Sequence, residues 1–328
     1  MAIGMPAPWL SGPAVAVAAA SIGGLKLGVP HLVRAAALVF LGATMGTAVT
    51  PDTLAQMARW PLSLAGLAVV VVAIMASIAF YLERVHGYDR ATARLAGVPG
   101  ALPFVLALAA ESTGDARRIA IIQMMRLLIL LVCLPLVLTL AGAGGAAVVG
   151  TKAAPATVAI ATLLAQIAVL LAAGTAGGLI FEKLGAPAGM LFGAMIASGL
   201  LYGSGLLSVA MPDWLMLPGF VVIGAMVGSN FAGTDLALLK STVLAGVGSV
   251  LVGAGVALVC AWAVASILHL PVAQVWLAYA PGGVETMTIM ALALGLDPAY
   301  VGAHHVARFL GLGLVVPWWL SGYLKRKD

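Results

Sequence analysis

The sequence predicts an all-α polytopic membrane protein with two homologous helical repeats. Three observations predict it: an extreme apolar composition, apolar runs of bilayer-spanning length, and scarce residue types that recur at one spacing. Of the 328 residues, 63% are hydrophobic and only 8% are charged, whereas a soluble domain carries about 25% charged residues. Because surface area grows with mass, a soluble fold of this size could not bury so much apolar surface. The bilayer is therefore the expected solvent.

Continuous apolar runs favour helices over a membrane β-barrel. A barrel strand alternates apolar and polar residues over about 10 positions, but residues 62–81 and 243–268 are almost uninterruptedly apolar. Helices of about 20 such residues match the hydrocarbon thickness. The predicted membrane segments are residues 10–25, 31–49, 60–82, 91–112, 118–140, 156–181, 187–205, 213–232, 241–268, 272–294 and 299–323.

Two of these segments contain sequences that break a helix. Residues 97–103 read GVPGALP, and residues 280–285 read APGGVE. Proline removes a backbone donor and glycine relaxes the backbone, so both helices should unwind there. Unwound backbone at membrane depth is tolerated only where protein or a watery cavity satisfies it. We therefore predict a re-entrant or discontinuous segment at each position.

An internal duplication relates these two breaks. At a shift of 182 residues, Asp115 matches Asp297 and Arg126 matches Arg308, and both residue types are scarce in this chain. The other matched pairs are Pro30 with Pro212, Gly42 with Gly224, Gly46 with Gly228, Pro99 with Pro281, Gly100 with Gly282, and Pro135 with Pro317. We predict a first membrane repeat at residues 1–140, a linker at 141–155 and a second repeat at 156–328. The segment at 156–181 has no counterpart, so we expect a matching N-terminal helix to be missing.

The positive-inside rule gives the orientation. If the two broken segments are re-entrant, nearly all Lys and Arg residues outside the membrane fall on one side, and only Arg59 and Lys152 fall on the other. That majority includes Arg34, which this count places at a helix end. Each full repeat then crosses an odd number of times, which predicts inverted repeats, a transporter architecture. The expected location is the cell membrane, as a multi-pass protein of a bacterial inner membrane.

The composition also limits the partners. Basic residues lie singly or in pairs at helix ends, apart from residues 325–327, so the net charge of +5 does not indicate direct contact with nucleic acid. The lipid bilayer and a small solute or ion are the expected partners, and a homo-oligomer remains open. Small residues at four-residue spacing, such as Gly42 and Gly46, indicate close helix packing in lipid.

The C-terminal part of the chain carries a distinctive motif. Residues 280–287 (APGGVETM), 295–301 (GLDPAYV) and 304–309 (HHVARF) resemble the AbrB-duplication membrane protein family, and residues 97–103 with Asp115 and Arg126 are similar to its first copy. The resemblance covers nearly the whole chain. Members of that family are labelled as ammonia monooxygenases, as regulators and as transporter-like proteins. The family shares its name with an unrelated soluble DNA-binding regulator, whose domain matches no segment here.

Glu285 stands out because a carboxylate inside a membrane segment is a functional candidate by default. The alternative is a carboxylate that caps the half-helix beginning near Val284 and is neutralised or paired with an arginine. The first copy has Pro103 at the equivalent position, so any chemistry of Glu285 belongs to one half only.

Arg126 and Arg308 lie about nine residues inside their helices, so each should pair with a carboxylate or a carbonyl. Asp115 and Asp297 are expected to be structural caps of the helices that follow them. His304 and Arg308, four residues apart, are expected to share a helical face. His304 and His305 point in different directions, which disfavours a metal site and leaves a proton or substrate contact or plain polar packing.

Three function classes follow: a secondary transporter or exporter of a small solute, a membrane-embedded regulator acting through partners, and the ammonia monooxygenase of the family label. The last needs metal or another redox centre, which the scattered histidines do not supply, so an enzyme is disfavoured and no cofactor, metal or catalytic residue is expected. We expect a small anionic or weakly acidic solute where the two broken segments meet, with Glu285 as coupling group. The candidate substrate or coupling residues are Pro99, Gly100, Arg126, Pro281, Gly282, Gly283, Glu285, Thr286, His304, His305 and Arg308.

Overall fold

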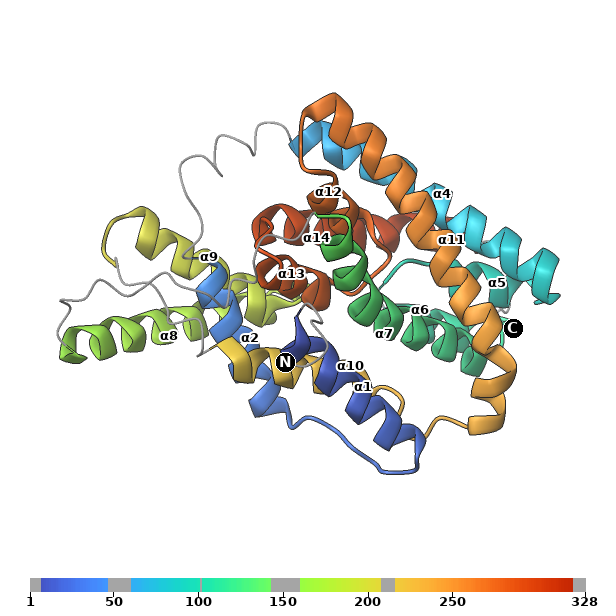
Figure 1. Ribbon diagram of the computed structural model, residues 1–328, viewed down its shortest axis with the longest axis horizontal. Coiled ribbons are helices and arrows are strands. Elements are labelled where there is room, and N and C mark those ends of the chain that lie inside the picture. The colour runs from blue at the N-terminus through green and yellow to red at the C-terminus, as the bar shows by residue number, and fades with distance from the viewer. Residues whose placement is uncertain (1–6, 47–59, 101, 143–159, 208–215, 321–328) are drawn as a thin grey trace.

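The computed structural model describes residues 7–46, 60–100, 102–142, 160–207 and 216–320, and it confirms the all-α prediction over those residues (Figure 1). The helices are α1 (Pro8–Ile22), α2 (His31–Gly46), α4 (Trp60–His86), α5 (Arg90–Gly97), α6 (Leu102–Ala110), α7 (Ala116–Leu140), α8 (Ile160–Lys183), α9 (Gly189–Gly203), α10 (Leu217–Ser229), α11 (Leu236–Leu268), α12 (Val272–Tyr279), α13 (Val284–Ala293) and α14 (Pro298–Trp319). Arg59, Lys152, Pro212 and the basic residues 325–327 lie outside the described residues, as does most of the linker.

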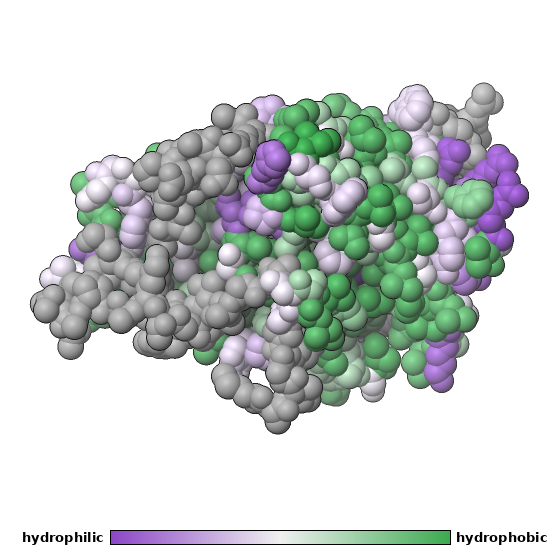
Figure 2. Space-filling view, turned by 45° about the horizontal axis from the view of Figure 1, so that its top comes forward, coloured by the Kyte–Doolittle hydropathy of each residue, from purple (hydrophilic) through white to green (hydrophobic). Residues whose placement is uncertain are grey.

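Within the described ranges, five helices are long and apolar enough to cross a membrane: α4, α7, α11, α14 and the stretch Leu164–Lys183 of α8. Many large apolar side chains on them face outward, among them Leu244, Trp262 and Leu314. Figure 2 shows hydrophobic residues spread over much of one face of the molecule, with strongly hydrophilic side chains gathered mainly toward one edge. Such a surface is stable in lipid, where apolar side chains need no burial against protein.

The first predicted break is a helical hairpin. Helix α5 ends at Gly97 and α6 begins at Leu102. Thr92, near the start of α5, accepts a hydrogen bond through Oγ1 from the backbone N–H of Asp115 at 2.7 Å. The start of α5 therefore lies beside the start of α7, the helix that follows α6. A broken helix that crossed straight through would hold these two points at opposite ends.

The second break is also a hairpin. His305 and Arg308 of α14 bond the carbonyls of Leu277 and Ala280, each 28 residues earlier, so α12 runs parallel to α14. Helix α13 runs the other way, because Arg308 contacts Gly282 at the start of α13 while Gly302 lies against Thr288 further along it. Helices α12 and α13 are therefore antiparallel, and the break at residues 280–283 forms the tip of the hairpin.

The two hairpins open toward opposite ends of α14. The base of the second hairpin adjoins the N-terminal end of α14. The first hairpin adjoins the C-terminal end of α14. There the Trp319 carbonyl accepts a hydrogen bond from Arg94 of α5 at 2.8 Å, and the guanidinium of Arg94 lies 4.9 Å from the Trp319 ring centroid. The tips meet in between, where a Cβ built on Gly100 would lie 3.1 Å from the Gly282 carbonyl oxygen.

The early helices of each half pack on the other half. Helix α1 packs along α10, α2 along α9, and α4 along α11. A Cβ on Gly42 would lie 2.2 Å from the Leu191 carbonyl oxygen, and one on Gly224 would lie 2.1 Å from that of Leu10. Only glycine permits such backbone contact, so the small-residue spacing in the sequence reports real helix interfaces.

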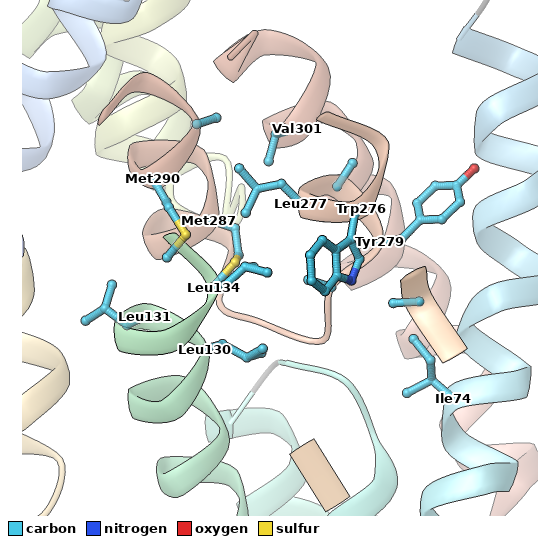
Figure 3. Packing of buried hydrophobic residues seen from close by; sticks show 14 of the residues in the cluster. Ile74, Leu130, Leu131, Leu134, Trp276, Leu277, Tyr279, Met287, Met290 and Val301 are labelled. Carbon is cyan, nitrogen blue, oxygen red and sulfur yellow. The ribbon is translucent and has the colours of Figure 1, made fainter. Parts of the chain in front are cut away.

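The hydrophobic core surrounds the second hairpin (Figure 3). Met287 and Met290 of α13 lie next to Leu134 of α7, while Trp276 and Tyr279 project from α12. Met287, Met290 and Tyr279 are completely buried. The hairpin is thus held by packing on several sides, which fixes the position of its tip.

Candidate functional site

Each hairpin is clamped by one buried arginine. Arg308 donates from Nη1 to the Ala280 carbonyl at 2.7 Å and from Nη2 to the Gly282 carbonyl at 2.6 Å. Arg126 donates in the same way to the carbonyls of Ala96 at 3.2 Å and Val98 at 2.7 Å. Of the two partners that the sequence left open, carbonyls and carboxylates, both arginines bind carbonyls. Neither forms a salt bridge with a described carboxylate.

A second side chain completes each clamp. Gln123 accepts from Arg126 through Oε1 at 3.1 Å and donates to the Leu95 carbonyl at 3.2 Å. His305, at the equivalent position in the second half, contacts Arg308 through Nδ1 at 2.7 Å and the Leu277 carbonyl through Nε2 at 3.0 Å. The imidazole ring can donate to the carbonyl and accept from the guanidinium only if Nε2 carries the hydrogen and Nδ1 is the acceptor. His305 is therefore held as one neutral tautomer, the counterpart of a glutamine.

His304 lies in a different environment. Its Nδ1 contacts the Tyr300 carbonyl at 2.8 Å and its Nε2 contacts Ser63 Oγ at 2.9 Å. Ser63 also bonds the Tyr300 hydroxyl, and its carbonyl accepts from the Tyr279 hydroxyl at 2.7 Å. His304 and Arg308 are both buried residues of α14, four positions apart, but they do not share a hydrogen-bond partner. Arg308 reaches toward the carbonyls of α12, which brings it to His305, three residues before it, instead.

The capping aspartates organise the helix starts. Asp115 accepts from the N–H groups of residues 117 and 118 at 3.0 and 3.2 Å, and Asp297 accepts from residues 299 and 300 at 2.8 and 3.2 Å. Each satisfies two amides that have no partner within the helix. Both aspartates lie away from the hairpin tips, at the bases of the two hairpins.

The hairpin tips are tightly packed. Pro99, Gly100, Pro281 and Gly282 are all buried. Gly100 has a φ of +84°, and a Cβ there would lie 3.3 Å from Arg308 Nη2, so glycine satisfies both the backbone geometry and the space. Half-buried Gly283 and buried Thr286 follow on the second hairpin. Gly283 is the N-cap residue of α13, and it has no side chain to cap the helix.

Glu285 pairs with an arginine that sequence reasoning did not connect to it. Its Oε1 lies 2.7 Å from Nη2 of Arg34, on α2. The Glu285 side chain is 16% exposed and that of Arg34 is 44% exposed. The sequence alone places Arg34 among the charges at helix ends. The two residues are 251 positions apart, and no local pattern links them.

The pair lines a half-open cavity of about 190 Å³. Its charged and polar lining comes from His31 and Arg34 of α2, Glu182 of α8 and Glu285 of α13. Its remaining lining is Ala35, Leu38, Ala186, Ala188, Gly189 and Met190. The first turns of α2, α9 and α13 thus converge on one space, and each helix N-terminus presents about half a positive charge.

The interior next to this cavity is electropositive. Arg308 donates a hydrogen bond to the carbonyl of Gly282, three residues before Glu285, and buried Arg126 clamps the other hairpin. Arg126 Nε has no hydrogen-bond partner. Among the described residues, no group of three or more His, Cys, Asp or Glu side chains has the arrangement of a metal site. The arrangement suits recognition of a small charged solute.

Comparison with known proteins finds a matching family and a curated relative. The family model described as "Transition state regulatory protein AbrB" matches residues 9–322. A curated protein of Escherichia coli (strain K12) named "Putative regulator AbrB" is 27% identical over 322 residues, which cover 97% of this chain and 90% of that protein. No solved structure gives a significant match.

Proposed function

The chain belongs to the AbrB family, and we propose that it acts in the bilayer as a secondary transporter of a small solute. The membrane character rests on the five apolar helices of spanning length. The transport role rests on the arrangement of the two hairpins. Helical hairpins that enter from opposite sides and meet in the middle create an interior site that can be opened toward either side.

Inverted repeats account for the paired contacts. Arg126 with Gln123, and Arg308 with His305, share three contacts at the shift of 182 residues: arginine to Val98 or Ala280, arginine to Gln123 or His305, and Gln123 or His305 to Leu95 or Leu277. The second carbonyl differs, since Arg126 bonds Ala96 and Arg308 bonds Gly282. The hairpins open toward opposite ends of α14, as an inverted duplication requires. We interpret both hairpins as re-entrant segments of the membrane domain.

The observation that carries the proposal is the Arg34–Glu285 pair. It lies in a cavity at the tip of the second hairpin, next to backbone that has left the helical conformation. Ionisable side chains within membrane segments are costly and mark solute or proton pathways. A structural pair alone would not require a cavity around it.

Flux measurements test the proposal. Purified protein in proteoliposomes should move at least one member of a panel of small weak acids and inorganic ions, in response to a pH gradient. Glu285→Gln should abolish the coupled flux while the protein remains folded and inserted. Glu111→Gln, the same change at an exposed position after α6, should leave flux unchanged. Absence of flux for the wild type across the panel, or normal coupled flux in Glu285→Gln, contradicts the proposal.

A second candidate is a membrane-embedded regulator that acts through a partner protein. The name of the Escherichia coli relative favours it. In that case the cavity would bind solute without moving it, and loss of the protein would alter transcript levels. Binding without flux in the same proteoliposomes would favour this candidate.

A further inference from the structure

The Arg34 cavity has chemistry that identifies its ligand more closely than the proposed function does. We infer that the solute is a small monocarboxylate that takes the place of Glu285 on Arg34, and that Glu285 takes up one proton when it is displaced. The inference rests on the proposed function for its membrane setting, but it concerns binding and can be tested without flux.

The size of the cavity limits the ligand. A volume of about 190 Å³ is of the same order as the roughly 150 Å³ cavity that holds one benzene molecule. It therefore accepts a molecule of a few heavy atoms. Its apolar wall is made of small and flexible side chains, including Ala35, Leu38 and Met190, which suits a short hydrocarbon chain attached to a polar group.

The charge distribution favours an anion. Three helix N-termini converge on the cavity, and each favours negative charge near its first turn. The buried Arg308 clamp lies next to the cavity, because it bonds the Gly282 carbonyl. The opposing negative groups are Glu285, which is already paired, Glu182 in the last turn of α8, and the C-terminal end of α8 itself.

The pair itself shows which chemical group Arg34 binds. The resident ligand of its guanidinium is a carboxylate, held through one N–H group at 2.7 Å. A guanidinium has five N–H donors and binds carboxylates best through two of them. The contact with Glu285 is therefore incomplete, and a free carboxylate could bind Arg34 in the bidentate manner. Arg34 is also the more exposed partner, so it can be reached from the cavity.

Displacement of Glu285 is balanced by one proton. A solute carboxylate and a proton enter, the Glu285 carboxylate leaves Arg34 and becomes a carboxylic acid, and the net charge of the site does not change. The charged or titratable groups that face Glu285 are Arg34 and His31 of α2 and Glu182 of α8. Helices α14, α12 and α7 also pack against α13. The contacts described above engage their buried titratable groups, which are Arg308, His305, His304, Tyr300, Tyr279 and Arg126, and Asp297 caps α14.

Only one half of the molecule has this site. At the shift of 182 residues, Arg34 corresponds to Met216 and Glu285 corresponds to Pro103. The clamps of the two hairpins are duplicated, but the Arg34–Glu285 pair is not. One carboxylate and one proton per chain is therefore the expected stoichiometry.

Equilibrium binding of radiolabelled formate, acetate, propionate and lactate to the full chain in nanodiscs, between pH 5 and 8, tests the inference. In the wild type, affinity should fall by up to about tenfold per pH unit, the limit for uptake of one proton per anion. Glu285→Gln should bind with little pH dependence, and at pH 8 more tightly than the wild type, because the uncharged glutamine competes less well than glutamate with a solute carboxylate for Arg34. Arg34→Gln should lose binding, and Glu111→Gln should keep the wild-type pH profile.

Three results would overturn the inference. The first is loss of binding in Glu285→Gln as large as that in Arg34→Gln, which would make Glu285 itself the ligand-binding group. The second is binding of radiolabelled methylammonium in preference to every carboxylate. The third is no carboxylate binding by either the wild type or Glu285→Gln at any pH. If binding follows the expected pattern but no solute crosses the membrane, the transport proposal fails and this inference stands.

Discussion

The equivalence of His305 and Gln123 makes a sharp prediction about the second hairpin. Both residues use one side-chain atom to accept from the clamping arginine and another to donate to a carbonyl of the hairpin. Glutamine at position 305 could make both contacts. His305→Gln should therefore destabilise the protein by at most about 1 kcal/mol, the scale of a shape change with its hydrogen bonds retained.

Arg308→Gln should behave differently. It removes the donors to two buried carbonyls, those of Ala280 and Gly282. The Ala280 carbonyl keeps a hydrogen bond from the Gly282 N–H at 2.7 Å, so only the Gly282 carbonyl is left without a donor. An unsatisfied buried acceptor costs about 1–3 kcal/mol, which is the expected range. Side-chain hydrogen bonds measured within membranes average about 0.6 kcal/mol, which places the expected loss toward the lower end of that range. The hairpin tip should loosen, because the Gly282 carbonyl then has no fixed donor.

Unfolding by sodium dodecyl sulfate in mixed micelles measures both changes on one scale. The reciprocal variant Gln123→His is the matched control in the first half and should also be tolerated. Equal destabilisation by His305→Gln and Arg308→Gln would refute the clamp assignment. If transport is found, His305→Gln should also keep its pH dependence, since a histidine fixed as one neutral tautomer does not relay protons. Loss of that dependence would return His305 to the proton pathway.

Other parts of the structure give three further predictions. Gly224→Ala places a methyl group 2.1 Å from a carbonyl oxygen of α1 and should destabilise by about 1–3 kcal/mol in thermal unfolding; Gly12→Ala, where nothing lies within 4 Å, should not lower stability. Ser63→Ala removes the hydroxyl that bonds His304 and should lower stability by about 1–3 kcal/mol in the same assay. Unchanged stability would show that the buried His304 ring does not depend on this hydrogen bond. Thr92→Val removes the acceptor at the base of the first hairpin and should accelerate hydrogen exchange at residues 115–118; unchanged exchange would contradict the closure of that base.

The features that sequence could predict are those with a strong local cause. Apolar runs of spanning length gave the long helices, and Pro-Gly pairs gave the two breaks, because proline and glycine disrupt a helix whatever surrounds them. Asp115 and Asp297 were recognised as caps from their position before a helix. The buried arginines were expected to find a carboxylate or carbonyl, because a bare buried charge is too costly.

The features that sequence could not predict depend on tertiary contacts. Nothing near Arg34 in the sequence distinguishes it from an arginine at a membrane surface, and its pairing with Glu285 appears only when α2 reaches the tip of the second hairpin. The choice of His305 over His304 as the partner of Arg308 depends on the rotation of α14 relative to α12. The cross-packing of α1 on α10 and α2 on α9 likewise has no local signature beyond small residues.

The most direct test of the account is the side of the membrane from which each hairpin enters. In a background with Cys133 and Cys260 replaced by alanine, single cysteines at Arg90, Arg117, Val272 or Leu296 mark the bases of the two hairpins. A membrane-impermeant maleimide applied to oriented vesicles should label positions 90 and 117 from one side, and positions 272 and 296 from the opposite side. Labelling of positions 90 and 117 from different sides, or of all four positions from the same side, would contradict the entry of the two hairpins from opposite sides of the membrane.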